Sequence, residues 1–143
     1  MNGQLMAVLE QITGEEQAIL DGRSQVSRSL YTDSRDFVID SEKMLEKGKL
    51  IDIRPHTRFV HFPKHRHNYV EIIYMCSGKT DHIINGIDRV TLRQGELLFL
   101  NQNCSHEILP AKREDVAVNF IVLPEFFDRA FKMMDDENIL RDF

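Results

Sequence analysis

Four side chains of the kinds that bind metals or polar ligands lie in the middle of the chain. One residue separates His65 from His67, three residues separate His67 from Glu71, and His106 lies in a later segment. Imidazole nitrogens and a carboxylate oxygen form a mixed ligand set that suits Zn, Ni, Mn or Fe. A His-x-His pair alone is weak evidence, because histidines at strand ends are often only solvated or hydrogen-bonded. These four residues, called here the histidine–glutamate set, are a candidate metal site if the fold brings them together.

The surrounding residues favour a ligand pocket as well. Side chains alternate between the two faces of a strand, so residues an even number apart share a face if the strand is unbroken. One continuous strand would therefore place Ile73 and Met75 as an apolar floor beneath the polar set, which is the profile of a binding site. His82 shares a face of the next strand with Ile84, although the sequence does not show which face. The predicted ligand-binding residues are His65, His67, Tyr69, Glu71, Ile73, Met75, His82 and His106.

Short β-rich runs must position these residues. After Gly48 we expect eight strands, over residues 50–54, 58–62, 69–76, 80–84, 88–92, 96–100, 105–109 and 116–123. Asn85-Gly86 lies between two of them and predicts a two-residue type I′ hairpin turn. Antiparallel strands without intervening helices favour a jelly roll or a small barrel.

The first part of the chain, residues 1–48, lacks this β pattern and is expected to form a helical segment and an arm. Thr13 and Glu16 have the spacing of a capping box, in which two side chains satisfy the free N–H groups at a helix start. Residues 21–36 show no periodicity and are expected to form a surface loop or a mobile arm. Tyr31 is its one large anchor.

The last part, residues 124–143, is expected to be an amphipathic helix. Pro124 suits the first helical position, and an apolar stripe follows at Phe126, Phe127, Ala130, Phe131 and Met134. The stripe requires a cover, which is either the chain's own barrel or a second copy in a dimer. The chain stops at Phe143 without a turn or a polar tail, so we expect a longer protein to continue there.

Composition narrows the class of protein. A chain of 143 residues is long enough for one domain, and its net charge of −5 argues against direct nucleic-acid binding. No apolar run approaches the ~20 residues of a membrane span, and the N-terminus lacks the features of a secretory signal. Two widely separated cysteines fit a reducing compartment. We therefore expect a cytoplasmic protein without membrane contact.

The full spacing of the histidine–glutamate set, followed by Gly78, resembles the first motif of the cupin superfamily. Gly95 and His106 have the separation of the first glycine and the histidine in that superfamily's second motif. The chain departs from the two motifs at Phe59, Asn101, Asn103 and Pro110, of which Phe59 replaces the leading glycine. The resemblance implies a cupin-type double-stranded β-helix, a jelly-roll barrel over residues 49–123 with flanking helices. It also implies that His65, His67, Glu71 and His106 hold a divalent transition metal.

Within that superfamily, residues 50–123 are most similar to the N-terminal sensing domain of AraC-type transcription regulators. That resemblance implies a homodimer formed through the C-terminal helix and a small-molecule effector, a sugar or a carboxylate, bound in the barrel. It also implies DNA contact only through a C-terminal domain with two helix-turn-helix units, which this sequence does not contain. Such a domain is not an enzyme. The alternative is a metal-dependent cupin enzyme of the dioxygenase or sugar isomerase type, and a barrel that serves only in dimerisation is a third reading.

Overall fold

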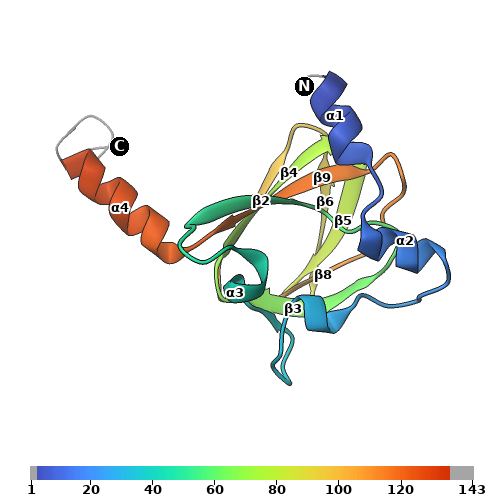
Figure 1. Ribbon diagram of the computed structural model, residues 1–143, viewed down its shortest axis with the longest axis horizontal. Helices are drawn as coiled ribbons and strands as arrows, with labels where there is room; N and C mark the ends of the chain where they lie inside the picture. Colours follow the sequence, from blue (N-terminus) through green and yellow to red (C-terminus); the bar gives the residue numbers. More distant parts are fainter. Residues whose placement is uncertain (1–2, 136–143) are drawn as a thin grey trace.

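The structure is a computed structural model that describes residues 3–135. Figure 1 shows a barrel of strands with short helices around it. The strands are β1 (Val38–Ile39), β2 (Ile51–Pro55), β3 (Phe62–His67), β4 (Val70–Ser77), β5 (Lys79–Ile84), β6 (Asp88–Arg93), β7 (Leu97–Leu100), β8 (His106–Ile108) and β9 (Val116–Val122). The helices are α1 (Gly3–Glu10), α2 (Gly14–Leu20), α3 (Ser41–Met44) and α4 (Pro124–Asp135), with a 3₁₀ turn at Arg28–Leu30.

Two sheets form the barrel. One has five strands in the order β1-β3-β8-β5-β6, and the other has four in the order β2-β9-β4-β7. Among the described strands, β5 and β6 are the one pair that is adjacent both in sequence and in a sheet. All other pairs join segments distant in sequence, as in a jelly roll. The predicted all-β barrel with flanking helices is confirmed.

Each sheet turns one face toward the interior of the barrel. In β4, Glu71, Ile73 and Met75 are buried, whereas the alternating Ile72 and Tyr74 are half-buried on the outer face. One apolar cluster in the interior consists of Ile73, Met75, Leu92, Leu100 and Ala117. A second cluster combines barrel residues such as Phe62, Tyr69 and Ile121 with residues of the N-terminal segment such as Ile19 and Tyr31. The N-terminal segment therefore covers part of the barrel.

The strand expected over residues 58–62 is wrong, because β3 begins at Phe62 and continues to His67. Phe59 has a φ of 73°, in the left-handed region that bulky residues rarely adopt, so the extended backbone is interrupted there. Phe59 occupies the position of the motif's leading glycine, and its backbone keeps a glycine-like conformation. The sequence pattern missed β3 because its inward positions carry histidines in place of apolar residues.

The histidine–glutamate set does not lie on one unbroken strand, which was the condition for its members to share one face. The chain bends at Asn68 and Tyr69, so that β3 belongs to the five-stranded sheet and β4 to the four-stranded sheet. His67 and Glu71 therefore face each other across the barrel interior and do not follow one another along one strand. β3 and β4 lie in different sheets, but each still turns one face toward the barrel interior. The alternation of inward and outward residues along the sequence therefore cannot reveal that the chain changes sheets.

The turn at Asn85-Gly86 joins β5 to β6 much as expected. Asn85 and Gly86 have φ values of 51° and 77°, and the N–H of Ile87 donates to the carbonyl oxygen of Ile84 at 3.1 Å, which fits a type I′ turn. The ladder, however, pairs Ile84 with Asp88. The connection is thus one residue longer than the predicted two-residue loop.

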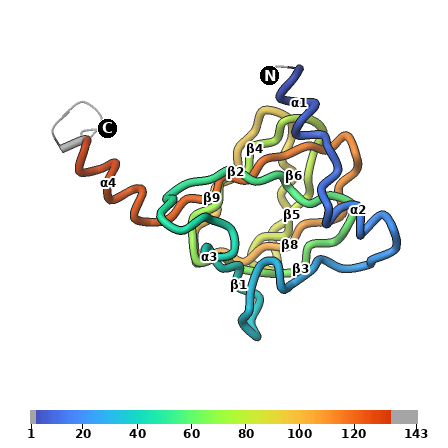
Figure 2. The backbone as a smooth tube through the Cα atoms, in the orientation of Figure 1, coloured from blue at the N-terminus to red at the C-terminus, as the bar shows by residue number. Residues whose placement is uncertain are grey.

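The N-terminal segment is fastened to the barrel. The helical start is broken between α1 and α2, and the capping box at Thr13 and Glu16 is present. The unpredicted strand β1 pairs in parallel with β3, and Figure 2 shows this part of the chain passing along β3. Tyr31 is 8% exposed. The arm of residues 21–36 is therefore anchored at its end by a buried side chain.

The C-terminal helix α4 begins at Pro124, as predicted, and projects away from the barrel in Figures 1 and 2. Phe126 and Phe127 are half-buried, whereas Phe131 is 59% exposed. The expected continuation of the helix to Phe143 lies outside the described residues, as does the side chain of Met134. Within residues 3–135, no helix is both long and apolar enough to span a membrane.

Candidate functional site

Strands β3 and β8 bring three histidines together inside the barrel. His65 lies opposite His106 in the antiparallel pair, and His67 follows on the same face of β3. One ring nitrogen from each of the three histidines lies within 4.8 Å of the others, and Nε2 of His67 is 3.2 Å from Nε2 of His106. All three side chains are buried. They are positioned as a candidate metal site.

Glu71 reaches the same point from the four-stranded sheet. Its Oε2 lies 2.7 Å from Nε2 of His67 and 3.4 Å from Nε2 of His106. The side chain is almost fully buried, because β4 is a central strand of its sheet. The two sheets thus assemble the histidine–glutamate set between them.

The protonation states of His65 and Glu71 suit cation binding. Burial lowers the pKa of His65 well below its ordinary value, and the nearby charges of His106 and His67 lower it further. Burial alone would raise the pKa of Glu71, but the charges and close contacts of His67 and His106 hold that pKa well below its ordinary value. A neutral imidazole and an ionised carboxylate are the forms that bind metal ions.

Hydrogen bonding gives a structural test of whether an ion fits. Nδ1 of His65 donates to the carbonyl oxygen of Pro63 at 2.7 Å, so the lone pair is on Nε2, as in metal-binding histidines. Within the described chain, Oε2 of Glu71 is buried without a hydrogen bond of acceptable geometry, despite its short contact with His67. Nδ1 of His67 and of His106 also lacks a partner there. The atoms that converge are Oε2 of Glu71 and Nε2 of His67 and of His106, and such a group of nitrogen and oxygen donors fits a shared cation.

His82 lies next to His106. The two rings stack with centroids 5.9 Å apart, and Nε2 of His82 is 2.8 Å from the hydroxyl of Thr80. Burial lowers the pKa of His82 to about 3. The hydroxyl of Thr80 also contacts Sδ of Met75 at 3.5 Å. His82 is therefore not part of the three-histidine group that could hold a metal, and it is linked through Thr80 to Met75, a member of the apolar cluster that contains Ile73.

A cavity of about 100 Å³ lies beside the set, within the barrel. Of the predicted ligand-binding residues, His65, Tyr69 and Glu71 line it, whereas Ile73, Met75, His67, His82 and His106 do not. The remaining lining residues are Thr13, Glu15, Tyr31, Ile39, Met44, Arg54, Pro55, His56, Thr57, Phe62, Ile108, Asn119 and Ile121. The wall of the cavity is therefore formed by members of the histidine–glutamate set together with residues of the N-terminal segment, β2 and β9.

Sequence reasoning missed several polar lining residues, among them Arg54, His56 and Asn119. Asn119 is the single polar residue in the apolar run "VAVNFIVL", and it faces inward beside Ile121. Arg54 and His56 are an even number of residues apart at the end of the next strand, so they share a face. A polar residue in an otherwise apolar core strand was the signal that could have found this part of the cavity.

The N-terminal segment closes the cavity through Tyr31 and Glu15. The hydroxyl of Tyr31 donates to Oε2 of Glu15 at 2.5 Å and contacts the hydroxyl of Thr57 at 3.1 Å. Burial raises the pKa of Tyr31 above its ordinary value, and its bond to Glu15 adds to this effect. A neutral phenol therefore joins the arm, helix α2 and the barrel at the cavity wall.

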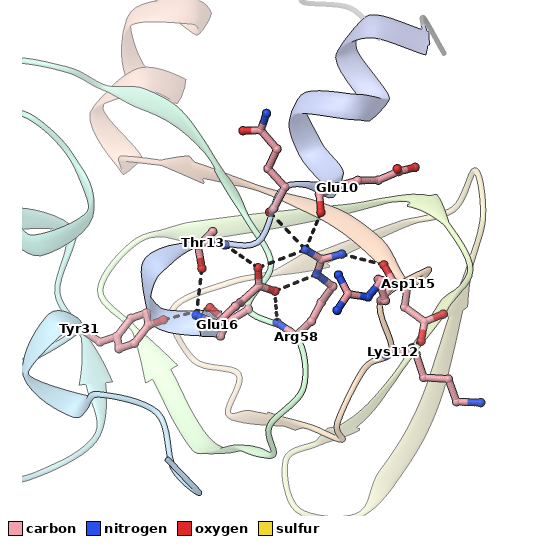
Figure 3. Close-up of polar contacts among 10 residues, drawn as sticks. Glu10, Thr13, Glu16, Tyr31, Arg58, Lys112 and Asp115 are labelled. Atoms are coloured by element: carbon pink, nitrogen blue, oxygen red, sulfur yellow. Dashed lines mark hydrogen bonds and ion pairs between the residues drawn. The ribbon is translucent and has the colours of Figure 1, made fainter. Parts of the chain in front are cut away.

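A buried ion pair fastens the same helix more deeply, as Figure 3 shows. Nε of Arg58 donates to Oε2 of Glu16 at 2.8 Å, and Oε1 of Glu16 accepts from the N–H of Thr13 at 3.0 Å. The guanidinium also donates to the carbonyl oxygens of Glu10, Gln11 and Arg113. These residues are called here the arginine network. Arg58 therefore joins the N-terminal helices to the barrel.

Comparison with known families gives one match. The family model described as the AraC-like ligand binding domain matches residues 51–131, which includes all four residues of the histidine–glutamate set. No curated protein is significantly similar to the chain.

Several solved structures are similar to part of the chain. KdgF from Halomonas sp. is 12% identical, with 55% of this chain and 84% of that chain covered and a TM-score of 0.42. A cupin protein with a double-stranded β-helix fold from Methanocaldococcus jannaschii is 15% identical, with 52% and 68% covered and a TM-score of 0.43. A predicted oxalate decarboxylase from Thermotoga maritima is 23% identical, with 51% and 64% covered and a TM-score of 0.42.

Proposed function

The chain belongs to the family of AraC-like ligand binding domains, and from that premise we propose that it senses a small-molecule effector. The effector binds inside the barrel and controls a C-terminal helix-turn-helix domain that lies outside this sequence. DNA contact belongs to that second domain, because this chain carries a net charge of −5. The sensor acts in the cytoplasm and is not itself an enzyme.

The cavity in the barrel, with polar groups among apolar walls, is the observation that carries this proposal. It measures about 100 Å³, and both barrel residues and residues of the N-terminal segment line it. Ligand sites in proteins are concave, with a few converging polar groups among apolar walls. The cavity has this composition, since Tyr69, Ile108 and Ile121 line it together with Glu71 and His65.

The histidine–glutamate set supports a divalent transition metal, namely Zn, Ni, Mn or Fe, next to the effector. His65, His67, Glu71 and His106 would hold it, and their donor atoms fit such an ion. When bound, the metal supplies a Lewis-acid anchor for an oxygen atom of the effector. His65 and Glu71 also line the cavity, so these two residues connect the two sites.

The N-terminal segment supplies a way for effector binding to change the protein. A ligand shifts an equilibrium only by the difference in its affinity for the two states. Thr13, Glu15 and Tyr31 contribute to the cavity wall, so a ligand that contacts them stabilises the closed arrangement. We propose domain limits of 1–48 for this segment, 49–123 for the barrel and 124–143 for the C-terminal helix.

A homodimer is the proposed oligomeric state. The stripe on α4 leaves Phe131 59% exposed, and the outer face of the four-stranded sheet exposes Ile53 and Phe99 by 54% and 64%. These two residues end one row across that sheet, with Phe120 and Ile72 between them. Exposed apolar areas of this kind are typical of protein interfaces. In analytical ultracentrifugation, Phe131→Asp should shift a dimer toward monomer if α4 is the interface.

Two observations test the proposal that the protein is a regulator. The first is the sequence encoded after Phe143, and the second is DNA binding by the full-length protein. We expect two helix-turn-helix units encoded after Phe143, and DNA binding by the full product that changes with a barrel ligand. A stop codon directly after Phe143 would contradict the regulator. In limited proteolysis, an effector should protect residues 21–36, because they include Tyr31, which lines the cavity. Unchanged cleavage at saturating effector would count against closure by this segment.

A metal-dependent enzyme of the dioxygenase or sugar isomerase type is the second candidate, favoured by the geometry of the three histidines. It requires a tightly held ion and turnover of the bound small molecule. Elemental analysis of tag-free protein tests the first requirement: less than about a tenth of an equivalent of any transition metal would contradict a resident ion. Chemical conversion of a barrel ligand by metal-loaded protein would favour the enzyme over the sensor.

A further inference from the structure

Three polar side chains missed from the sequence lie together on the inner face of the four-stranded sheet. Arg54 and Asn119 are direct cross-strand partners in the pair β2–β9. His56 follows Arg54 by two residues and is held by its backbone N–H, which donates to the carbonyl oxygen of Ala117 at 3.0 Å. Direct cross-strand neighbours have Cβ atoms only about 5 Å apart. All three residues line the cavity.

These side chains have unused hydrogen-bonding capacity. His56 is 5% exposed, yet within residues 3–135 its Nε2 has no hydrogen-bond partner, and neither does Oδ1 of Asn119. Burial lowers the pKa of His56 to about 4, so the ring is neutral near neutral pH. Buried polar groups in native proteins are nearly always satisfied. Two such atoms on the wall of one cavity therefore indicate a polar ligand.

Arg54 adds a positive charge that the described chain leaves without a counter-ion. Its one described hydrogen bond is a long one, 3.4 Å from Nη1 to the carbonyl oxygen of Met44, and no described carboxylate lies within ion-pair distance. Arg58 shows the opposite situation, since its guanidinium is paired with Glu16 and three carbonyl oxygens. Arg54 stands at the rim of the cavity with donors available.

The acidic residues of the cavity wall are already engaged. Glu15 accepts from the hydroxyl of Tyr31 and from the N–H of Ser27, and Glu71 lies against His67 and His106. Arg54 is therefore the charged group with free capacity among the described lining residues. A guanidinium with open donors pairs best with a planar carboxylate, because two parallel N–H groups can bind its two oxygens.

The size of the cavity limits the ligand further. About 100 Å³ is well below the ~300–1,000 Å³ of typical drug-sized sites. A long chain or a disaccharide does not fit unless the N-terminal segment moves. A short chain with one carboxylate and one further oxygen does fit the arrangement of charged and neutral polar groups.

From these observations we infer that the cavity binds a short-chain hydroxy or oxo carboxylate, with its carboxylate on Arg54 and its second oxygen near His56 and Asn119. This inference rests on the proposed function and names the chemical class of the effector. Neutral His56 and the amide of Asn119 recognise a hydroxyl or carbonyl oxygen, and Arg54 distinguishes an acid from a neutral polyol of similar size.

Isothermal titration calorimetry with lactate and pyruvate tests the inference, with glycerol and arabinose as neutral probes. Three proteins are compared: the unchanged chain, Arg54→Gln, and the matched control Arg66→Gln, which loses the same charge at an exposed position outside this cavity. We expect the acids to bind the unchanged chain and the control equally. Binding to Arg54→Gln should be at least about tenfold weaker, since hydrogen bonds to charged groups contribute about 1.5–3 kcal/mol.

Circular dichroism and melting temperature without ligand establish that each variant is folded. Arg54→Lys serves as a second variant that keeps the charge, and it should retain part of the affinity because it loses only the paired geometry. Equal binding of the acids to Arg54→Gln would overturn the inference. Binding of arabinose without binding of either acid would overturn it too, while leaving the sensor proposal intact. Absence of heat and of thermal stabilisation with all four probes would contradict both proposals.

Discussion

The barrel and its cover contain two buried polar clusters that differ in how well they are satisfied. The arginine network joins Glu16 to Arg58, which are 1% and 2% exposed, and each group has several hydrogen-bond partners. The histidine–glutamate set is equally buried, but Glu71 and two of its histidines retain atoms without partners among the described residues. Similar burial thus accompanies complete hydrogen bonding in one cluster and incomplete bonding in the other.

This difference separates a structural role from a binding role. A buried ion pair is tolerated when every donor and acceptor is satisfied, and it then fixes the arrangement of the elements it joins. An incompletely satisfied cluster costs free energy in the empty protein, and a ligand that completes it recovers that energy. This contrast supports an architectural role for the arginine network and the proposed binding role of the histidine–glutamate set and the cavity beside it.

The largest expected effect comes from breaking the arginine network. Arg58→Ala leaves Glu16 buried without its counter-ion, and we expect a loss of about 3–5 kcal/mol in the free energy of unfolding. Urea denaturation followed by circular dichroism measures it. Lys43→Ala is the control, because its ion pair with Asp33 is 3.0 Å long but exposed, and it should cost less than ~1 kcal/mol. Equal losses in the two variants would remove the contrast between the clusters.

The second effect comes from completing the histidine–glutamate set. Zn²⁺ at about 100 times its dissociation constant should stabilise the unchanged protein by about 2.7 kcal/mol, because it binds the folded state. The stabilisation should be lost in His106→Ala and kept in His61→Ala, whose histidine is exposed and paired with Glu107. Thermal unfolding with and without Zn²⁺ measures both variants. An equal shift in His106→Ala would place the zinc elsewhere.

The third effect sharpens the comparison through pH. Burial alone would raise the pKa of Glu16, but hydrogen bonds from Arg58 and Thr13 and the charge of Arg58 bring that pKa below its ordinary value of 4.5. The ionised side chain therefore stabilises the folded protein fully above pH 4.5, and this contribution is lost as pH falls through the lower folded pKa. The free-energy difference between the unchanged protein and Glu16→Gln should shrink in acid. A difference that stays constant from about pH 7 to about pH 3 would contradict this linkage.

The smallest effect tests one member of the arginine network. The hydroxyl of Thr13 accepts from the N–H of Glu16 at 3.1 Å and caps α2. Thr13→Ala should cost about 1 kcal/mol, because the first turn of the helix loses a hydrogen-bond partner. Thr13→Ser keeps the hydroxyl and should cost less. Urea denaturation of the two variants compares them directly, and a larger loss in the serine variant would show that the methyl group matters more than the cap.

Much of the fold could be predicted from the sequence, because alternating apolar runs and turn residues record local structure. The strand limits of β4 to β9 agree with the pattern within a residue or so, and Pro124 starts α4 as expected. The two-residue strand β1 was missed, since it is defined by its pairing with β3 and not by its own residues. The strand expected at residues 58–62 was wrong because histidines replace apolar residues on the inner face of β3.

The candidate site was predictable only where a known motif covers it. The spacing of His65, His67 and Glu71, with His106 downstream, led to the correct expectation that the fold could gather them, and the role of these residues as ligands stays a prediction. Arg54 and Asn119 belong to no motif, and their proximity is created by the pairing of β2 with β9. Residue pairs of this kind cannot be recognised from local sequence patterns, because paired strands in a jelly roll are far apart in the sequence.

The bend at Asn68 and Tyr69 also bears on the order in which the site assembles. It closes a very short loop, so the entropy required to bring His65, His67 and Glu71 together is small. His106 arrives only when β8 pairs with β3, a contact between distant segments that forms more slowly. We therefore expect His65, His67 and Glu71 to come together before His106, whose arrival requires the pairing of β8 with β3.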